Sequence, residues 1–199
     1  LRGAKEIAEE CRARGLAKAV VGIPKTIDND IMYLDKSFGF ETAFAEAVKA
    51  ITCAHTESLG SFNGVGLVKL MGRDSGFIAC HATLAGSDVN CVLIPEVPFG
   101  LDGPTGLLEV LRARLEKRRH AVIVVAEGAG QDLVADETGT DASGNRKLGD
   151  IGLYLKDRIN AYFKALKMEV NLKYIDPSYT VRSVPAGPQD NVYCSYLAQ

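Results

Sequence analysis

The sequence lacks a paired-cysteine motif, a long apolar run and an excess of charge of either sign. Its five cysteines are scattered along the chain, which argues against a disulfide framework or a zinc site and favours reduced thiols in a reducing compartment. No apolar run approaches the length of a membrane span. The formal net charge of −2 gives no electrostatic reason to bind nucleic acid or an anionic membrane, so neither is an expected partner.

An initiator methionine and a targeting peptide are also missing. The first residues already have helical spacing, with Gly15 placed as a C-terminal cap, and residues 192–199 have a helical pattern too. We therefore expect a fragment of a longer protein, for which the lack of a targeting peptide carries no information. The 199 residues, 47% of them apolar, are enough to fill the core of one large domain or two small ones.

Apolar patterns of two kinds alternate along the chain. Apolar-rich stretches, several of them continuously apolar, predict strands at 16–21, 64–70, 91–94, 120–126 and 170–175. Helical spacing predicts helices that begin near 38, 77, 104 and 150, and the polar, glycine-rich stretch 131–147 predicts a long surface loop. This alternation is typical of an α/β fold, a mostly parallel, doubly wound sheet with helices on both faces in three αβα layers.

Chemistry-bearing side chains follow one predicted strand after another. The carboxyl ends of parallel strands lie at one edge of a sheet, where open α/β sheets bind their ligands. We therefore expect these side chains to converge on one rim. They are Lys25, Thr26, Asp28, Asp30, Arg73, Asp74, Glu96, Glu127 and Arg182.

These residue types suit phosphoryl transfer to a hydroxyl group. That reaction needs positive charge or metal on the phosphates and a carboxylate that takes the proton of the attacking hydroxyl. Asp28 or Asp30 could be that base, and the other could lie near Mg²⁺ through water. Lys25 could hold the transferring group, while Arg73 and Arg182 could each clamp a phosphate.

Simpler explanations exist for each motif. Asp-Asn-Asp at 28–30 is also typical of a turn that caps its own amides. Arg73 could pair with a neighbouring acid, and Glu127 could bind the amides of the glycine-rich loop after it. Gly72 and Gly76 could serve only a tight turn. The three histidines have no metal-ligand spacing.

The motifs together resemble the 6-phosphofructokinases over essentially the whole chain. The first, Gly-Ile-Pro-Lys-Thr-Ile-Asp-Asn-Asp at 22–30, is highly specific. The others follow in the order of that family, at 71–73, 95–96, 127–128 and 182. Three longer stretches resemble the plant and trypanosomatid ATP-dependent branch, namely 69–77, 127–131 and 176–179.

The resemblance implies a two-lobed phosphofructokinase fold that is incomplete in this chain. Residues 1–38 are expected to end the nucleotide-side lobe, 39–187 to form the sugar-phosphate lobe, and 188–199 to return to the first lobe. The implied reaction is the Mg²⁺-dependent transfer of a phosphoryl group from ATP to fructose 6-phosphate. A homo-oligomer, dimer or tetramer, is implied as well, with cytoplasmic residence and a plastid as the alternative.

The resemblance also implies roles for the first loop. Asp28 would accept the proton of the 1-hydroxyl, Thr26 would contact the substrate or the transferring phosphate, and Asp30 would lie near Mg²⁺ through water. Lys25 stands where bacterial ATP-dependent enzymes have glycine. Lysine there is typical of pyrophosphate-dependent enzymes and also of the plant-like ATP branch, so pyrophosphate remains the alternative donor.

Five further residues are implied to hold the sugar phosphate. Met71 and Gly72 would line the sugar pocket, Arg73 would contact substrate phosphate or hydroxyls, and Glu127 would bind sugar hydroxyls. Arg182 would reach the 6-phosphate across a subunit interface. Two phosphate-binding arginines of the bacterial pattern are replaced here, at about Gly64 and Asn191.

A third functional hypothesis also remains. The protein could be a regulatory subunit that binds sugar phosphate without catalysis.

Overall fold

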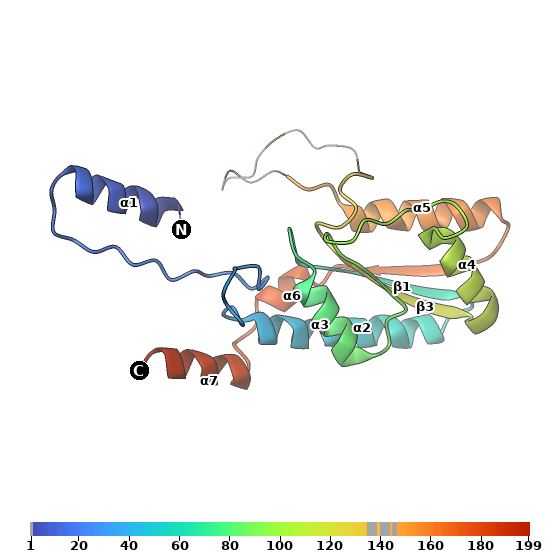
Figure 1. The fold of residues 1–199 in the computed structure, drawn as a ribbon. Coiled ribbons are helices and arrows are strands. Elements are labelled where there is room, and N and C mark those ends of the chain that lie inside the picture. Colours follow the sequence, from blue (N-terminus) through green and yellow to red (C-terminus); the bar gives the residue numbers. More distant parts are fainter. Residues whose placement is uncertain (1, 135–138, 140–143, 145–146) are drawn as a thin grey trace.

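A computed structural model describes residues 2–134, 139, 144 and 147–199. Among them, four parallel strands form one sheet in the order β2-β3-β1-β4 (Figure 1). The strands are β1 (Gly64–Leu70), β2 (Cys91–Leu93), β3 (His120–Ala126) and β4 (Asn171–Ile175). The predicted parallel sheet is therefore confirmed for these strands, and their carboxyl ends share one edge.

Helices cover both faces of this sheet. Helices α4 and α5 pack on one face and α2 and α3 on the other, which gives the three expected layers. Short α6 also contacts α2, and α7 follows it at the end of the chain. The helices are α1 (Arg2–Ala13), α2 (Phe40–Leu59), α3 (Phe77–Gly86), α4 (Leu107–Arg118), α5 (Ile151–Ala165), α6 (Ser178–Arg182) and α7 (Pro188–Leu197).

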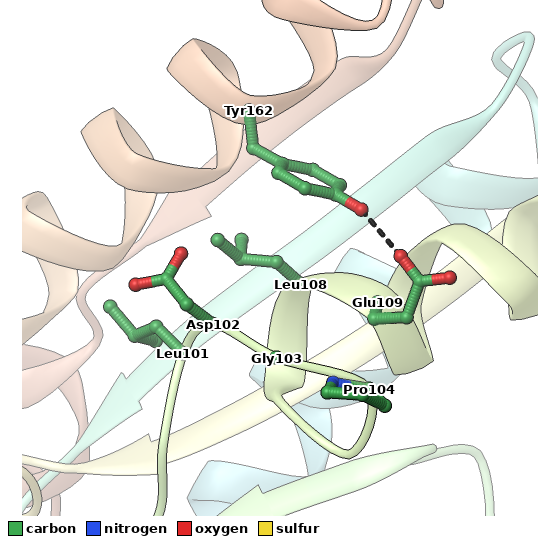
Figure 2. Close-up of a pocket in the computed structure, with 7 residues that line it drawn as sticks. All are labelled: Leu101, Asp102, Gly103, Pro104, Leu108, Glu109 and Tyr162. Carbon is green, nitrogen blue, oxygen red and sulfur yellow. Dashed lines mark hydrogen bonds between the residues drawn. The ribbon is translucent and has the colours of Figure 1, made fainter.

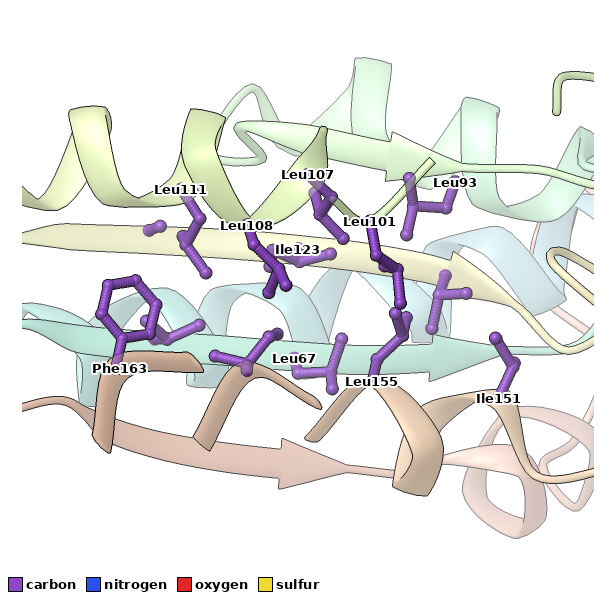
Figure 3. Close-up of a cluster of buried hydrophobic side chains, with 14 of the residues drawn as sticks. Leu67, Leu93, Leu101, Leu107, Leu108, Leu111, Ile123, Ile151, Leu155 and Phe163 are labelled. Atoms are coloured by element: carbon purple, nitrogen blue, oxygen red, sulfur yellow. The ribbon is translucent and has the colours of Figure 1, made fainter. Parts of the chain in front are cut away.

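The two central strands explain why their sequences are continuously apolar. Leu67 of β1 and Ile123 of β3 point into the core beneath α4 and α5, where Leu108, Leu155 and Phe163 meet them (Figure 3). The alternate residues of both strands face α2 and α3 in a second core. Because side chains alternate between the faces of a strand, a strand covered on both sides needs apolar residues at every position.

The prediction of a strand at 16–21 was wrong. This segment is extended but makes no strand pairing within the described part of the chain, and Val21 is 85% exposed. Figure 1 shows it as the long unpaired connection between α1 and the sheet. An apolar composition favours burial, but a strand also needs a neighbour that takes its N–H and C=O groups.

Other local predictions stand. Gly15 ends α1 with a φ of 65°, and the amides of Gly15 and Leu16 bond the carbonyls of Arg12 and Cys11 in a Schellman pattern. The predicted loop at 131–147 lies largely outside the described residues. No helix in the described ranges is both long and apolar enough to cross a bilayer.

Helix α2 begins at Phe40, slightly later than the pattern suggests, because Gly39 has a left-handed backbone that a right-handed helix cannot include, and its cap comes from the other end of the chain. Gly39 has a φ of 83° and contributes no side chain to the cap. Instead the carboxylate of Asp190 in α7, which is 3% exposed, accepts bonds from the amides of Gly39 and Thr42 at 2.9 and 2.8 Å. It also accepts the Thr42 hydroxyl at 2.6 Å, so α7 is fixed to the start of α2.

Candidate active site

Three loops leave the carboxyl edge of the sheet and are joined to one another by hydrogen bonds. The amide of Gly128, after β3, donates to the carbonyl of Gly72, after β1, at 3.0 Å. The amide of Gly76 donates to the carboxylate of Glu96, after β2, at 2.8 Å. The expected convergence of strand ends is therefore present for these loops.

Glycine is required where the loops after β1 and β3 meet. Gly72 has a φ of 132°, which L side chains rarely adopt. A Cβ on Gly128 would lie 1.7 Å from the carbonyl oxygen of Arg73. Side chains at either position would push apart the loops that carry Arg73 and Glu127.

The loop 22–30 docks on the loop after β1 through Asp28. The Ser75 hydroxyl donates to the Asp28 carbonyl at 3.1 Å, and the backbone N–H of Arg73 bonds the Asp28 carboxylate. The Thr26 hydroxyl oxygen accepts the Asp28 amide at 3.1 Å. Asp28 Oδ1 is buried and has no hydrogen-bond partner within the described structure.

The turn expected from Asp-Asn-Asp is made by its middle residue. Asn29 has a φ of 58°, its side-chain oxygen accepts the Ser37 amide at 2.7 Å, and its side-chain nitrogen donates to the Asp35 carbonyl at 3.3 Å. Because Asn29 does the capping, the carboxylate of Asp28 is left for other chemistry. The turn reading of the motif is thus confirmed for Asn29, and the role of Asp28 stays a prediction.

The surroundings of Asp28 favour its protonated form. Burial raises its pKa from 3.8 to about 6, and the negative charges of Asp30 and Glu127 act in the same direction. The amide and the guanidinium of Arg73 act the other way and lower it. A carboxyl group with a pKa near 6 exchanges protons readily at neutral pH, as a general base must.

The charged residues proposed for the site differ in solvent exposure. Lys25 and Asp30 are exposed, while Arg73 and Glu127 are partly buried. Arg182 is exposed on α6, with its guanidinium carbon 4.8 Å from the ring centre of Tyr179.

Two adjoining cavities open at this rim. One of about 410 Å³ is lined by Arg73, Asp74, Pro95, Glu96, Gly128, Gln131 and Leu148. The other, of about 530 Å³, lies beneath residues 29–35 and shares Asp74 and Glu96 with the first. Arg182 lines neither cavity, and Met71 packs against the core beneath α2 and α3 instead.

A third cavity, of about 430 Å³, lies between α4 and α5, away from the residues of the strand ends (Figure 2). Its charged groups already have partners. Asp102 is paired with Arg158 at 2.9 Å, and Glu109 binds Arg112 and accepts the Tyr162 hydroxyl at 2.7 Å. Hydrogen bonds from Arg112 and Tyr162 lower the pKa of Glu109 to about 2.

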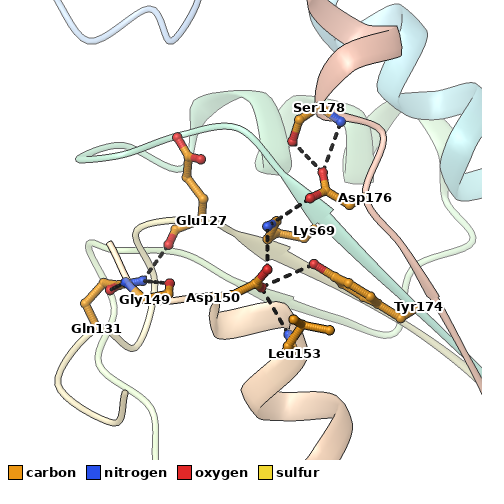
Figure 4. Close-up of polar contacts among 9 residues, drawn as sticks. All are labelled: Lys69, Glu127, Gln131, Gly149, Asp150, Leu153, Tyr174, Asp176 and Ser178. Atoms are coloured by element: carbon orange, nitrogen blue, oxygen red, sulfur yellow. Dashed lines mark hydrogen bonds and ion pairs between the residues drawn. The ribbon is translucent and has the colours of Figure 1, made fainter. Parts of the chain in front are cut away.

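Sequence reasoning missed a polar network beneath the rim (Figure 4). Lys69 Nζ lies 3.2 Å from Asp150 Oδ2 and 2.9 Å from Asp176 Oδ2. Burial opposes the charge of Lys69, but hydrogen bonds to the two carboxylates outweigh it and raise its pKa above the ordinary value. Lys69 stood inside a recognised motif, yet nothing in the sequence identified its partners.

Tyr174 and Asp176 are perturbed by the same network. Burial is the main cause that raises the pKa of Tyr174 to about 12. Burial also acts to raise the pKa of Asp176, but hydrogen bonds from Ser178 and Lys69 outweigh it, so this pKa is below its ordinary value. At neutral pH the network therefore holds a charged lysine beside an ionised Asp176.

Comparison with solved structures supports the fold. A pyrophosphate-dependent phosphofructokinase from Marinobacter aquaeolei matches 97% of this chain and 45% of its own, with a TM-score of 0.67 and 23% identity. A second, from Nitrosospira multiformis, matches 98% of this chain and 46% of its own, with a TM-score of 0.68 and 22% identity. At these identities the likeness concerns the fold alone.

Comparison of sequences gives closer relatives. ATP-dependent 6-phosphofructokinase 7 of Arabidopsis thaliana is 58% identical over all of this chain and 41% of its own length. ATP-dependent 6-phosphofructokinase of Trypanosoma cruzi is 47% identical over 99% of this chain and 41% of its own. The expected likeness to the plant and trypanosomatid branch is thus confirmed, and the chain spans less than half the length of these relatives.

The family model described as Phosphofructokinase matches residues 1–199. The match is continuous from the helix before the first motif to the helix after Arg182. This chain therefore belongs to the phosphofructokinase family.

Proposed function

We propose that the protein containing this chain transfers a phosphoryl group from ATP to the 1-hydroxyl of fructose 6-phosphate, the glycolytic reaction that gives fructose 1,6-bisphosphate. The observation that carries the proposal is Asp28. It is a half-buried carboxyl group with a pKa near 6 and one buried, unpartnered oxygen, on the loop with the most specific motif. The relatives named as ATP-dependent enzymes support the choice of donor.

Asp28 is proposed as the general base. Its unpartnered Oδ1 is available to accept the proton of the sugar's 1-hydroxyl, while the Arg73 amide holds the carboxylate in place. Thr26 is held next to it and is proposed to contact the substrate or the transferring phosphoryl group. Lys25, exposed on the same loop, offers a positive charge for that group, which gathers negative charge during transfer.

The sugar phosphate is proposed to occupy the cavity lined by Arg73. The Arg73 guanidinium contacts its phosphate or hydroxyls, Glu127 binds hydroxyls, and Met71 and Gly72 shape the pocket. Arg182 is proposed to hold the 6-phosphate of a substrate bound by a neighbouring subunit. It is exposed and lines neither cavity, which supports that role, and the role requires a homo-oligomer, either a dimer or a tetramer.

Magnesium is proposed to accompany ATP. Mg²⁺ prefers hard oxygen ligands, keeps several of its waters and, when bound, offsets the charge of the phosphates. Asp30 is an exposed carboxylate on the Asp28 loop, which fits a contact through water. No group of three or more potential metal ligands occurs among the described residues.

We also propose the division into lobes. Residues 39–187 contain the whole described sheet with its helices, which supports a sugar-phosphate lobe, and residues 1–38 approach it from outside. Residues 188–199 return along the start of α2. Cytoplasmic residence is proposed, with the plastid as the alternative, since two Arabidopsis relatives are named as chloroplastic.

The test uses the full-length protein with fructose 6-phosphate and either ATP or pyrophosphate. Turnover with ATP is expected, and turnover with pyrophosphate alone overturns the choice of donor. Asp28→Ala should lower kcat by about two to four powers of ten without a change in fold by circular dichroism. Asp157→Asn, an exposed carboxylate on α5, is the matched control. Near-normal activity of Asp28→Ala would remove Asp28 from the mechanism.

A further inference from the structure

We propose that Lys69 is a positioning residue for the sugar-phosphate site, although it contacts no substrate itself. It ties the loop that carries Glu127 and the helix that carries Arg182 to the end of one strand. The inference rests on the proposed function, because it concerns how the two ends of the same substrate are held. Figure 4 shows the residues that make this connection.

Lys69 occupies a central place beneath the rim. It is the last residue but one of β1, immediately before the loop with Met71 and Arg73, and its side chain is only 13% exposed. Its ammonium group lies between two carboxylates that come from different parts of the chain, Asp150 and Asp176. An ammonium group has three donors, so it can bind both at once.

The first arm leads from Lys69 to Glu127. Asp150 also caps α5, where its Oδ1 accepts the Leu153 amide at 3.1 Å. The preceding residue, Gly149, exchanges two hydrogen bonds with the side chain of Gln131, at 3.0 and 3.1 Å. The same side chain donates to the carbonyl of Glu127 at 2.7 Å, so the backbone of Glu127 is fixed while its carboxylate takes no part in the network.

The second arm leads from Lys69 to Arg182. Asp176 Oδ1 accepts both the amide of Ser178, at 3.1 Å, and its hydroxyl, at 2.5 Å. Ser178 is the first residue of α6, and Arg182 is the last. Because α6 is a helix of five residues, the direction of its first turn decides where Arg182 points.

Stability alone is a poor explanation for this network. The carboxylates more than offset the burial of Lys69, but an apolar group of similar size often stabilises a protein as much as a partly buried ion pair does. The two ends of a substrate, in contrast, must be bound at a fixed separation, and small displacements of the binding groups reduce rates strongly. The network positions both binding groups relative to β1, a strand that is paired on both sides.

The experiment measures KM for fructose 6-phosphate, KM for ATP and kcat in the full-length enzyme. Lys69→Met removes the charge and keeps an unbranched side chain of similar length. We expect it to raise KM for fructose 6-phosphate roughly 10- to 100-fold and to leave KM for ATP unchanged. Lys69→Arg, which can still bridge two carboxylates, should recover most of the affinity.

Two milder variants and one control complete the set. Asp150→Asn and Asp176→Asn each weaken one arm while keeping the shape of the side chain, so they serve even where Lys69→Met folds poorly. Each should raise KM for fructose 6-phosphate by less than Lys69→Met does. Lys173→Met is the matched control, because Lys173 lies on the neighbouring strand β4 and pairs with Glu57 at 3.8 Å.

Calorimetric titration of each variant with fructose 6-phosphate separates the possible failures. If the wild-type enzyme turns over the substrate and the variants bind it with unchanged affinity, only the role of Lys69 is overturned. Equal losses for ATP and fructose 6-phosphate, in step with a lower melting temperature, mark a purely structural network and also overturn it. A wild-type protein that neither binds nor phosphorylates fructose 6-phosphate overturns the proposed function and this inference with it.

Discussion

The hydroxyl of Ser75 donates a hydrogen bond to the backbone carbonyl of Asp28 over 3.1 Å. The two residues are 47 positions apart in the chain, and Ser75 is itself buried. This bond connects the loop that carries the proposed base to the loop after β1. The carboxylate proposed as the base is therefore positioned in part by a residue outside its own motif.

Ser75→Ala should reduce kcat while leaving the fold intact. The change leaves the Asp28 carbonyl without its donor, so the free energy of unfolding should fall by about 1 kcal/mol, and the looser base should slow proton transfer. Steady-state kinetics and urea unfolding measure the two effects. Ser183→Ala, at an exposed serine beyond α6, is the control, and a wild-type kcat in Ser75→Ala would contradict the positioning role of this bond.

The activity should depend on the ionisation of Asp28 near pH 6. Since the base must be ionised, kcat/KM is expected to fall below the pKa of Asp28, which is about 6. Glu127→Gln removes one of the negative charges that raise this pKa, so the acidic limb should move to lower pH, whatever happens to the maximum rate. A pH–rate profile of both proteins measures the shift, and a limb that stays in place argues against Asp28 as the titrating group.

Asp28→Asn should make the protein more stable above pH 6. Burial raises the folded-state pKa above the ordinary value of 3.8, so the folded state binds the proton more tightly than the unfolded chain. The free energy of unfolding therefore falls as the pH rises from about 4 to about 6 and stays lower above that range.

The neutral amide of the Asp28→Asn variant does not ionise, so it does not lose stability as the pH rises. The gain for Asp28→Asn is expected to be of the order of 1–2 kcal/mol at pH 8, once solvent screening is allowed for, and to vanish below about pH 4. Urea unfolding at several pH values measures it, with Asp157→Asn as the control that should show no such trend. A gain that is equal at all pH values would rule out ionisation as its cause.

Gly128→Ala should damage the site through its backbone. The added Cβ would fall 1.7 Å from the Arg73 carbonyl oxygen, so the loop with Arg73 must move, and kcat/KM for fructose 6-phosphate should fall by roughly 100-fold. Gly86→Ala meets nothing closer than 3.9 Å and should behave as wild type. Equal kinetics of the two variants would show that the loops do not need this close contact.

Asp190→Ala should loosen α7 from the sheet body, that is, the four strands with helices α2 to α6. It removes the only side chain seen to cap α2 in the described structure, together with the bond to the Thr42 hydroxyl. A cost of about 1–2 kcal/mol in the free energy of unfolding is expected, measured by urea denaturation. Gln189→Ala, at the exposed neighbouring position, is the control, and a similar stability of both variants would contradict the cap.

The local parts of the fold could be predicted from the sequence, because their causes are local. Strands β1 and β3 are apolar at nearly every position, since both faces are covered. The segment 16–21 has the same composition but no pairing partner among the described residues, and composition does not show partners. The rim residues could be named because each follows a strand or belongs to a specific motif.

The environment of those residues could not be predicted. The raised pKa of Asp28 depends on burial and on Glu127, which comes from a distant part of the chain. Lys69 and Asp150 are 81 positions apart, and Thr42 and Asp190 are 148 apart. Ordinary lysine and aspartate residues give no sign in the sequence of which distant group they will meet.

The contact between Gly39 and Asp190 has a mechanical consequence. The chain comes into the sheet body and leaves it at the same place, because these two residues are hydrogen-bonded to each other. The same stretch of chain is held at a second place, where the Ser75 hydroxyl bonds the Asp28 carbonyl. Residues 29–35, which line one of the two cavities, therefore span two fixed points and are restrained at both ends, like a bridge between supports.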